Sequence, residues 1–108
     1  MPGKYASGTY QPAFAPRWKY RGGETLTMDG TPQACTIPDG AHIFEIRAES
    51  AAVYFNVNHA NASAASPGYV ANGAVETLGP LDTLTALTLW GAGGQGPAVA
   101  HVMYFEEA

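Results

Sequence analysis

A period of two in the hydrophobic pattern, which begins at Glu24 and continues toward the C-terminus, restricts the fold of this chain more than any other feature. In residues 42–49, the apolar Phe44, Ile46 and Ala48 alternate with charged side chains, as expected for a β-strand with one buried face. Prolines and glycines separate such segments at intervals of about 8–12 residues. We therefore predict that residues 24–108 form one all-β domain, an antiparallel, jelly-roll-like β-sandwich of about seven or eight short strands.

Residues 52–58 alternate in the same way as residues 42–49, and only Ser50 and Ala51 separate the two segments. This spacing predicts a hairpin with one solvated face. The following residues 59–67 are small and polar, which predicts a loop too poor in large side chains to pack.

Two later segments, residues 83–90 and 98–105, are apolar on both faces. In the first of them the apolar phase shifts between Ala86 and Leu87, which indicates either burial of both faces or a β-bulge. A strand buried on both faces in so small a domain suggests contact with another subunit. The candidate subunit-interface residues are Leu87, Leu89, Trp90, His101, Met103 and Tyr104.

Residues 1–23 have a different pattern, with three prolines, four glycines and five aromatic residues. This composition forbids a helix and disfavours a central strand. Four of the five basic residues of the chain also lie here, among no acidic ones, whereas the rest of the chain holds all nine acids and only Arg47. We predict an extended basic arm, separate from the domain, that docks on a partner. Alternatives are an arm folded on its own domain and a solvated tail. The candidate partner-binding residues are Tyr5, Tyr10, Phe14, Arg17, Trp18, Lys19, Tyr20 and Arg21.

The sequence contains no arrangement of residues that predicts catalysis or a cofactor. The glycines of residues 91–96 match G-x-G-x-x-G, but Pro97 and a strand follow in place of the helix that a dinucleotide site requires. The three histidines lack the spacing of a metal site. Cys35 is the only cysteine and sits in a strand-like segment, which predicts a buried, structural thiol. We expect no enzyme, no cofactor, no metal and no small-molecule ligand.

The charges and the hydropathy also predict which partners the chain does not have. Pro12 and Pro16 interrupt the basic residues of the arm, so these residues form no continuous stripe for nucleic acid. No apolar run approaches the length of a membrane span, and the first residues lack the apolar core of a secretory signal. The lack of a secretory signal and the single cysteine together predict synthesis in a reducing cytoplasm.

Three stretches within residues 37–106 carry a family resemblance, namely IPDGAHIFEIRAESAAVYFNVN, SPGYVANGAVETLGPLDTLTALTLWGAGG and AHVMYFE. They are similar to the small β-sandwich virion proteins of tailed bacteriophages, in their short strands rich in Ala, Thr and Asn and their aromatic terminal strand. The resemblance implies a capsid decoration (cement) subunit on the virion surface. It also implies a homotrimer whose partner is the major capsid protein or another virion protein.

Other functions remain open on the sequence. One is a tail, spike-base or fibre-attachment module of the virion. Another is a glycan-binding β-sandwich, in which Trp18, Tyr54, Tyr69 or Trp90 stacks on a sugar. The last is a cupin-like enzyme.

Overall fold

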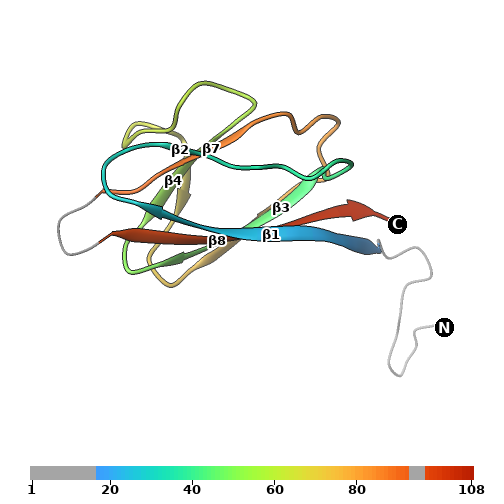
Figure 1. The fold of residues 1–108 in the computed structure, drawn as a ribbon, viewed down its shortest axis with the longest axis horizontal. Helices are drawn as coiled ribbons and strands as arrows, with labels where there is room; N and C mark the ends of the chain where they lie inside the picture. The colour runs from blue at the N-terminus through green and yellow to red at the C-terminus, as the bar shows by residue number, and fades with distance from the viewer. Residues whose placement is uncertain (1–16, 93–96) are drawn as a thin grey trace.

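The computed structural model describes residues 17–92 and 97–108, which form eight strands and no helix. The strands are β1 (Trp18–Met28), β2 (Gln33–Ala34), β3 (Ile43–Glu49), β4 (Val53–Val57), β5 (Gly68–Val70), β6 (Val75–Leu78), β7 (Leu87–Trp90) and β8 (Ala98–Glu107). The first sheet has the order β1-β8-β3-β6 and the second sheet the order β2-β7-β4-β5 (Figure 1). The two antiparallel sheets pack as a sandwich, which confirms the predicted all-β class.

The pairing of the strands gives this sandwich the topology of a jelly roll. β1 pairs with β8, β2 with β7, β3 with β6 and β4 with β5, so the second half of the chain folds back along the first. The two halves of the chain thus form one long hairpin. β8 also pairs with β3, and β7 with β4, so this hairpin is rolled up into two sheets. Jelly-roll domains are built in this way from eight antiparallel strands.

The predicted hairpin of residues 42–49 and 52–58 is wrong in its pairing, although the alternation within each strand is confirmed. β3 belongs to the first sheet and β4 to the second, and the chain crosses between them at Ser50, which has a φ of 75°. Each strand therefore points its apolar face at the other across the core. The rings of Phe44 on β3 and Phe55 on β4 meet edge to face, with their centroids 5.7 Å apart.

The core fills the space between the two sheets, and both contribute to it. It contains Met28, Phe44, Ile46, Ala48, Val53, Phe55, Val70, Leu84, Leu87, Leu89, Ala98, Ala100, Val102 and Tyr104. Alternate residues of β3, β4 and β8 supply most of these side chains, as period-two strands must. Among the residues that the structure describes, no helix could span a membrane.

The predicted boundary between arm and domain at residue 23 is also wrong, because it lies inside β1. This strand pairs with β8 from Trp18 opposite Glu107 to Met28 opposite Ala98, with one bulge between Tyr20 and Gly22. Gly22, which has a φ of 129°, accommodates this bulge. β1 is an edge strand, so its residues before Glu24 do not occupy a central position, as predicted for them.

Candidate functional site

Three of the six predicted subunit-interface residues belong to the core of the domain itself. Leu87, Leu89 and Tyr104 are at most 1% exposed and lie between the two sheets. They have no surface to offer to another subunit. The apolar character of these strands therefore reflects burial within one chain.

β7 is buried on both faces because a loop of the same chain covers its outer side. The Thr88 hydroxyl donates to the Ala60 carbonyl over 3.1 Å, and the Asn56 side chain donates to the same carbonyl over 2.9 Å. Ala62 is only 2% exposed. The loop thus contacts β7 through the Ala60 carbonyl and packs through Ala62, contacts that the sequence did not predict, whereas most of its other residues are exposed. The phase shift at Ala86 marks the start of β7 at Leu87 and is not a bulge within a longer strand.

The other three predicted interface residues do not form one surface. Trp90 lies on the outer face of the second sheet, where its ring is 5.8 Å from that of Tyr54 and its indole nitrogen donates to the Gly30 carbonyl. His101 and Met103 lie on the outer face of the first sheet, on alternate positions of β8. The structure therefore separates them by the thickness of the sandwich.

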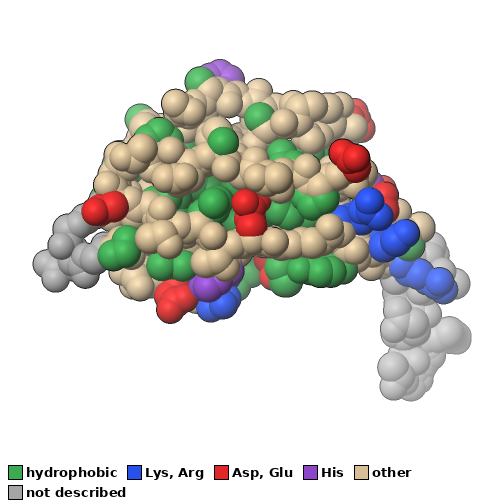
Figure 2. All heavy atoms as spheres, viewed as in Figure 1, with side chains coloured by type: hydrophobic (Ala, Val, Ile, Leu, Met, Phe, Trp, Pro, Cys, Tyr) green, Lys and Arg blue, Asp and Glu red, His purple; other side chains and the backbone are tan. Residues whose placement is uncertain are grey.

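An aromatic cluster lies on the outer face of the first sheet, where β1 begins and β8 ends. The ring of Phe105 is 5.6 Å from that of Trp18 and 5.8 Å from that of Tyr20. Trp18 is 41% exposed, Tyr20 58% and the neighbouring Met103 39%. We call these four residues the outer cluster. In Figure 2, hydrophobic side chains gather along the lower margin of the molecule, with Lys and Arg side chains close to them at the right.

Gly23 helps to shape this outer cluster. A Cβ atom at Gly23 would lie 3.1 Å from the Tyr20 hydroxyl and 2.7 Å from the Val102 carbonyl oxygen. The missing side chain therefore lets the Tyr20 ring lie along the strand, above the sheet. The side chains of the outer cluster therefore pack against one another and against the sheet, and they do not project singly into solvent.

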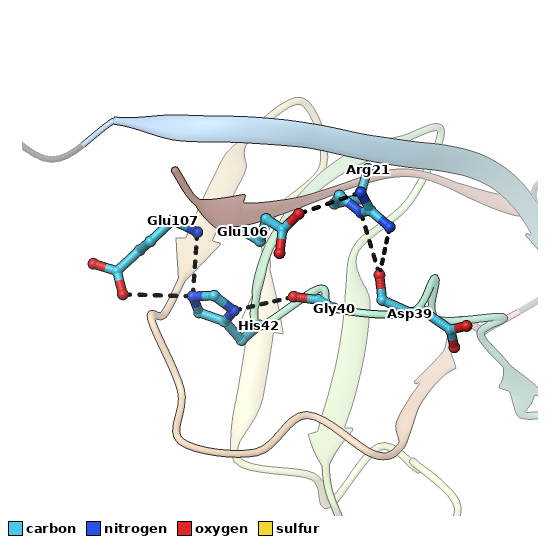
Figure 3. Close-up of polar contacts among 6 residues, drawn as sticks. All are labelled: Arg21, Asp39, Gly40, His42, Glu106 and Glu107. Carbon is cyan, nitrogen blue, oxygen red and sulfur yellow. Dashed lines mark hydrogen bonds and ion pairs between the residues drawn. The ribbon is translucent and has the colours of Figure 1, made fainter.

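Polar contacts fix the start of β1 beside this cluster (Figure 3). The guanidinium of Arg21 donates to the Asp39 carbonyl at 3.0 Å and 3.2 Å, and it pairs with the Glu106 carboxylate at 3.2 Å. Next to them, the His42 imidazole contacts the Gly40 carbonyl and the backbone of Glu107. These contacts join three segments that are far apart in sequence. They hold the first strand against the end of the last one.

Of the eight predicted partner-binding residues of the arm, the structure describes five. Trp18, Lys19, Tyr20 and Arg21 belong to β1, and Arg17 accepts a backbone hydrogen bond from Ala108. Trp18 and Tyr20 join the outer cluster, whereas Arg21 makes the contacts to Asp39 and Glu106. Tyr5, Tyr10 and Phe14 lie outside the described residues. The sequence analysis did not predict a role for Phe105, whose ring contacts both Trp18 and Tyr20. The aromatic character of the terminal strand was the signal that could have indicated it.

Three polar side chains on the outer face of the first sheet are connected like the residues of a catalytic triad. The Thr25 hydroxyl lies 3.2 Å from Nδ1 of His101, whose Nε2 lies 2.6 Å from a carboxylate oxygen of Glu49. The hydrogen bond with His101 holds the pKa of the Glu49 carboxyl below its usual range. However, these residues are cross-strand neighbours on an exposed sheet, with Thr25 directly opposite His101 and Glu49 diagonal to it, and β8 is bonded on both sides. Its backbone amides cannot converge on an oxyanion, so the row fits a surface network better than a triad.

Two other features bear on the chemistry of the chain. Burial raises the pKa of the Cys35 thiol to about 12, which keeps this cysteine protonated. Over residues 17–92 and 97–108, no three His, Cys, Asp or Glu side chains gather closely enough to hold a metal ion.

Three of the four residues that the sequence suggested for sugar stacking lie together on the second sheet. Tyr54 lies between Trp90 and Tyr69, whose ring centroid is 5.1 Å away. Trp18, the fourth, is on the opposite sheet. No family model, no curated protein and no solved structure matches this chain. Its function must therefore be argued from these surfaces.

Proposed function

We propose that this protein is a non-enzymatic structural subunit of a virion, which decorates the assembled capsid and stabilises it by bridging its capsomers. The observation that carries the proposal is the outer cluster of Trp18, Tyr20, Met103 and Phe105. Exposed aromatic residues that are held rigidly are the side chains that dominate the affinity of protein interfaces. The cluster also lies where the basic, aromatic N-terminal segment joins the domain, so the two can act as one docking surface.

The electrostatics and the topology support a binding role. Arg17 and Lys19 are exposed beside the cluster, and cations there would steer the domain toward an acidic partner surface. The jelly roll is also an architecture of viral capsid domains, although lectins and cupins share it, so the fold alone does not decide between them.

Assembly into a homotrimer would multiply this docking. Three outer clusters on one trimer would make each later contact effectively intramolecular, which raises the overall affinity without any new contact. Because Leu87, Leu89 and Tyr104 are buried, the subunit contacts must use other residues. Sedimentation velocity on the full chain tests the trimer directly.

The test of the proposed function is binding to capsids that lack the protein, prepared from the virus that encodes it. Trp18→Ala should weaken binding by about 2 kcal/mol or more, because it truncates an anchor of the cluster. Tyr69→Ala is the matched control, since Tyr69 is exposed to a similar degree as Trp18 but lies on the opposite sheet. Capsids without the protein should also release their genome at a lower temperature than decorated ones.

Three results would contradict the proposal. Equal loss of affinity in the two variants would remove the outer cluster as the docking site. Equal thermal limits for bare and decorated capsids would exclude a stabilising role. A copy number of a dozen or fewer per particle would favour the tail, spike-base or fibre-attachment function instead.

A further inference from the structure

The loop of residues 58–67 borders an open pocket of about 560 Å³ against the edge of β4. β5 pairs with β4 only as far as Gly68, opposite Phe55, so the end of β4 continues beyond its neighbour. The loop, drawn in yellow-green at the top of Figure 1, follows this end of β4. The pocket is lined by Phe55, Asn56, Val57, His59, Ser63, Ala65, Ser66, Pro67 and Gly68.

Hydrogen bonds within the loop hold this pocket in shape. The backbone N–H of Ser63 donates to the Ser66 hydroxyl at 2.9 Å, and the Ser66 N–H donates back to the Ser63 carbonyl at 3.0 Å. The Asn56 side chain donates to the carbonyls of Ala60 and Asn61. A pocket that is formed before its ligand arrives loses little affinity to ordering on binding.

The lining combines uncharged polar groups with apolar surface. The hydroxyls of Ser63 and Ser66 each accept a backbone hydrogen bond, so their own hydrogens remain available to a ligand. His59 adds an exposed imidazole, and Phe55 and Val57 add apolar walls. None of the lining residues is Asp, Glu, Lys or Arg. The pocket thus offers no permanent cation for a phosphate or a carboxylate.

We propose that this pocket binds a neutral saccharide. A pyranose ring carries C–H groups on its faces and hydroxyls on its rim, which matches apolar walls that alternate with hydroxyl and imidazole groups. The volume lies within the range typical of small-ligand sites. The inference goes beyond the proposed function and does not rest on it.

Amide resonances of the ¹⁵N-labelled full chain would test this inference. The probes are the methyl glycosides of glucose, galactose, mannose and N-acetylglucosamine at millimolar concentrations. At least one should shift the resonances of residues 55–69 in a saturable manner. Ala65→Phe should weaken that binding about tenfold or more, because the new ring would occupy the pocket. Ala64→Phe is the matched control, since Ala64 is an exposed neighbour in the same turn that does not line the pocket.

The inference is overturned if none of the four glycosides shifts these resonances. It is also overturned if the shifts centre on the outer cluster, or if the Ala65→Phe and Ala64→Phe variants bind equally well. Saturable shifts of the same resonances by inorganic phosphate or acetate, without any response to the glycosides, would replace the saccharide with an anionic ligand.

Discussion

The phenolic hydroxyl of Tyr104 donates a hydrogen bond to the carboxylate of Glu24 over 2.5 Å, from the last strand to the first. The same carboxylate oxygen accepts the backbone N–H of Thr36 at 2.8 Å. Thr36 follows β2, so this single side chain links the first sheet to a segment of the second. Tyr104 is fully buried, and burial together with this bond raises the pKa of its hydroxyl. The protonated phenol is therefore a permanent donor to Glu24.

We predict that Tyr104→Phe lowers the free energy of unfolding by about 1–3 kcal/mol, because it leaves the Glu24 carboxylate without this donor. Urea denaturation measures the change as a lower midpoint at constant slope. Tyr54→Phe removes a hydroxyl for which no partner is found among the described residues, and it should cost less than about 0.5 kcal/mol. Equal midpoints for the two variants would show that the Tyr104–Glu24 bond contributes no net stability.

The raised pKa of Cys35 leads to a prediction about its reactivity. Because only the thiolate is nucleophilic and the pKa of this thiol is about 12, the folded protein should resist iodoacetamide at pH 8. The unfolded chain in urea should react at the rate of an ordinary cysteine. Mass spectrometry of timed samples follows both reactions. Rapid alkylation of the folded protein would mean that Cys35 is an exposed and reactive thiol.

The hydrogen bond from His101 to Glu49 predicts a pH dependence. A carboxyl whose pKa is lowered in the folded state adds stability above its ordinary pKa, and this stability is lost as the pH falls through the lowered value. We expect the carboxyl resonance of Glu49 to titrate below the ordinary range of a glutamate. In His101→Gln its midpoint should move upward, toward that range. Identical midpoints in the two proteins would contradict this cause of the shift.

The sequence predicted which side chains point inward far better than which strands are neighbours. The alternation of Phe44 and Ile46 with charged residues requires only that one face of the strand be buried. It does not distinguish a hairpin from two strands that face each other across a core. Both arrangements bury Phe44 and Phe55, and the structure has the second. Strand pairing depends on the turn, and Ser50 allows the crossing between sheets with a positive φ.

The surfaces were harder to predict because they join segments that are remote in sequence. The outer cluster combines Trp18 and Tyr20 with Phe105, which no local pattern connects. The pocket depends on a loop of small residues, which packs through backbone carbonyls such as that of Ala60. Hydrophobicity alone does not reveal such packing, because its acceptors belong to the main chain.

Two N-terminal deletions should have very different effects on stability, because β1 begins well before the boundary that the sequence suggested. Deleting residues 1–16 leaves the described contacts of β1 in place, so the midpoint of urea unfolding should change little. Deleting residues 1–23 removes the paired start of β1, the rings of Trp18 and Tyr20, and the Arg21 contacts to Asp39 and Glu106. The ion pair alone is partly exposed and contributes about 0–1 kcal/mol. With the loss of packing on Phe105, we expect the free energy of unfolding to fall by about 2 kcal/mol or more in total.

Arg21→Ala in the full chain separates the contribution of the ion pair from that of the strand. Equal midpoints for the two deletions would mean that residues 17–23 do not stabilise the domain and behave as part of the arm.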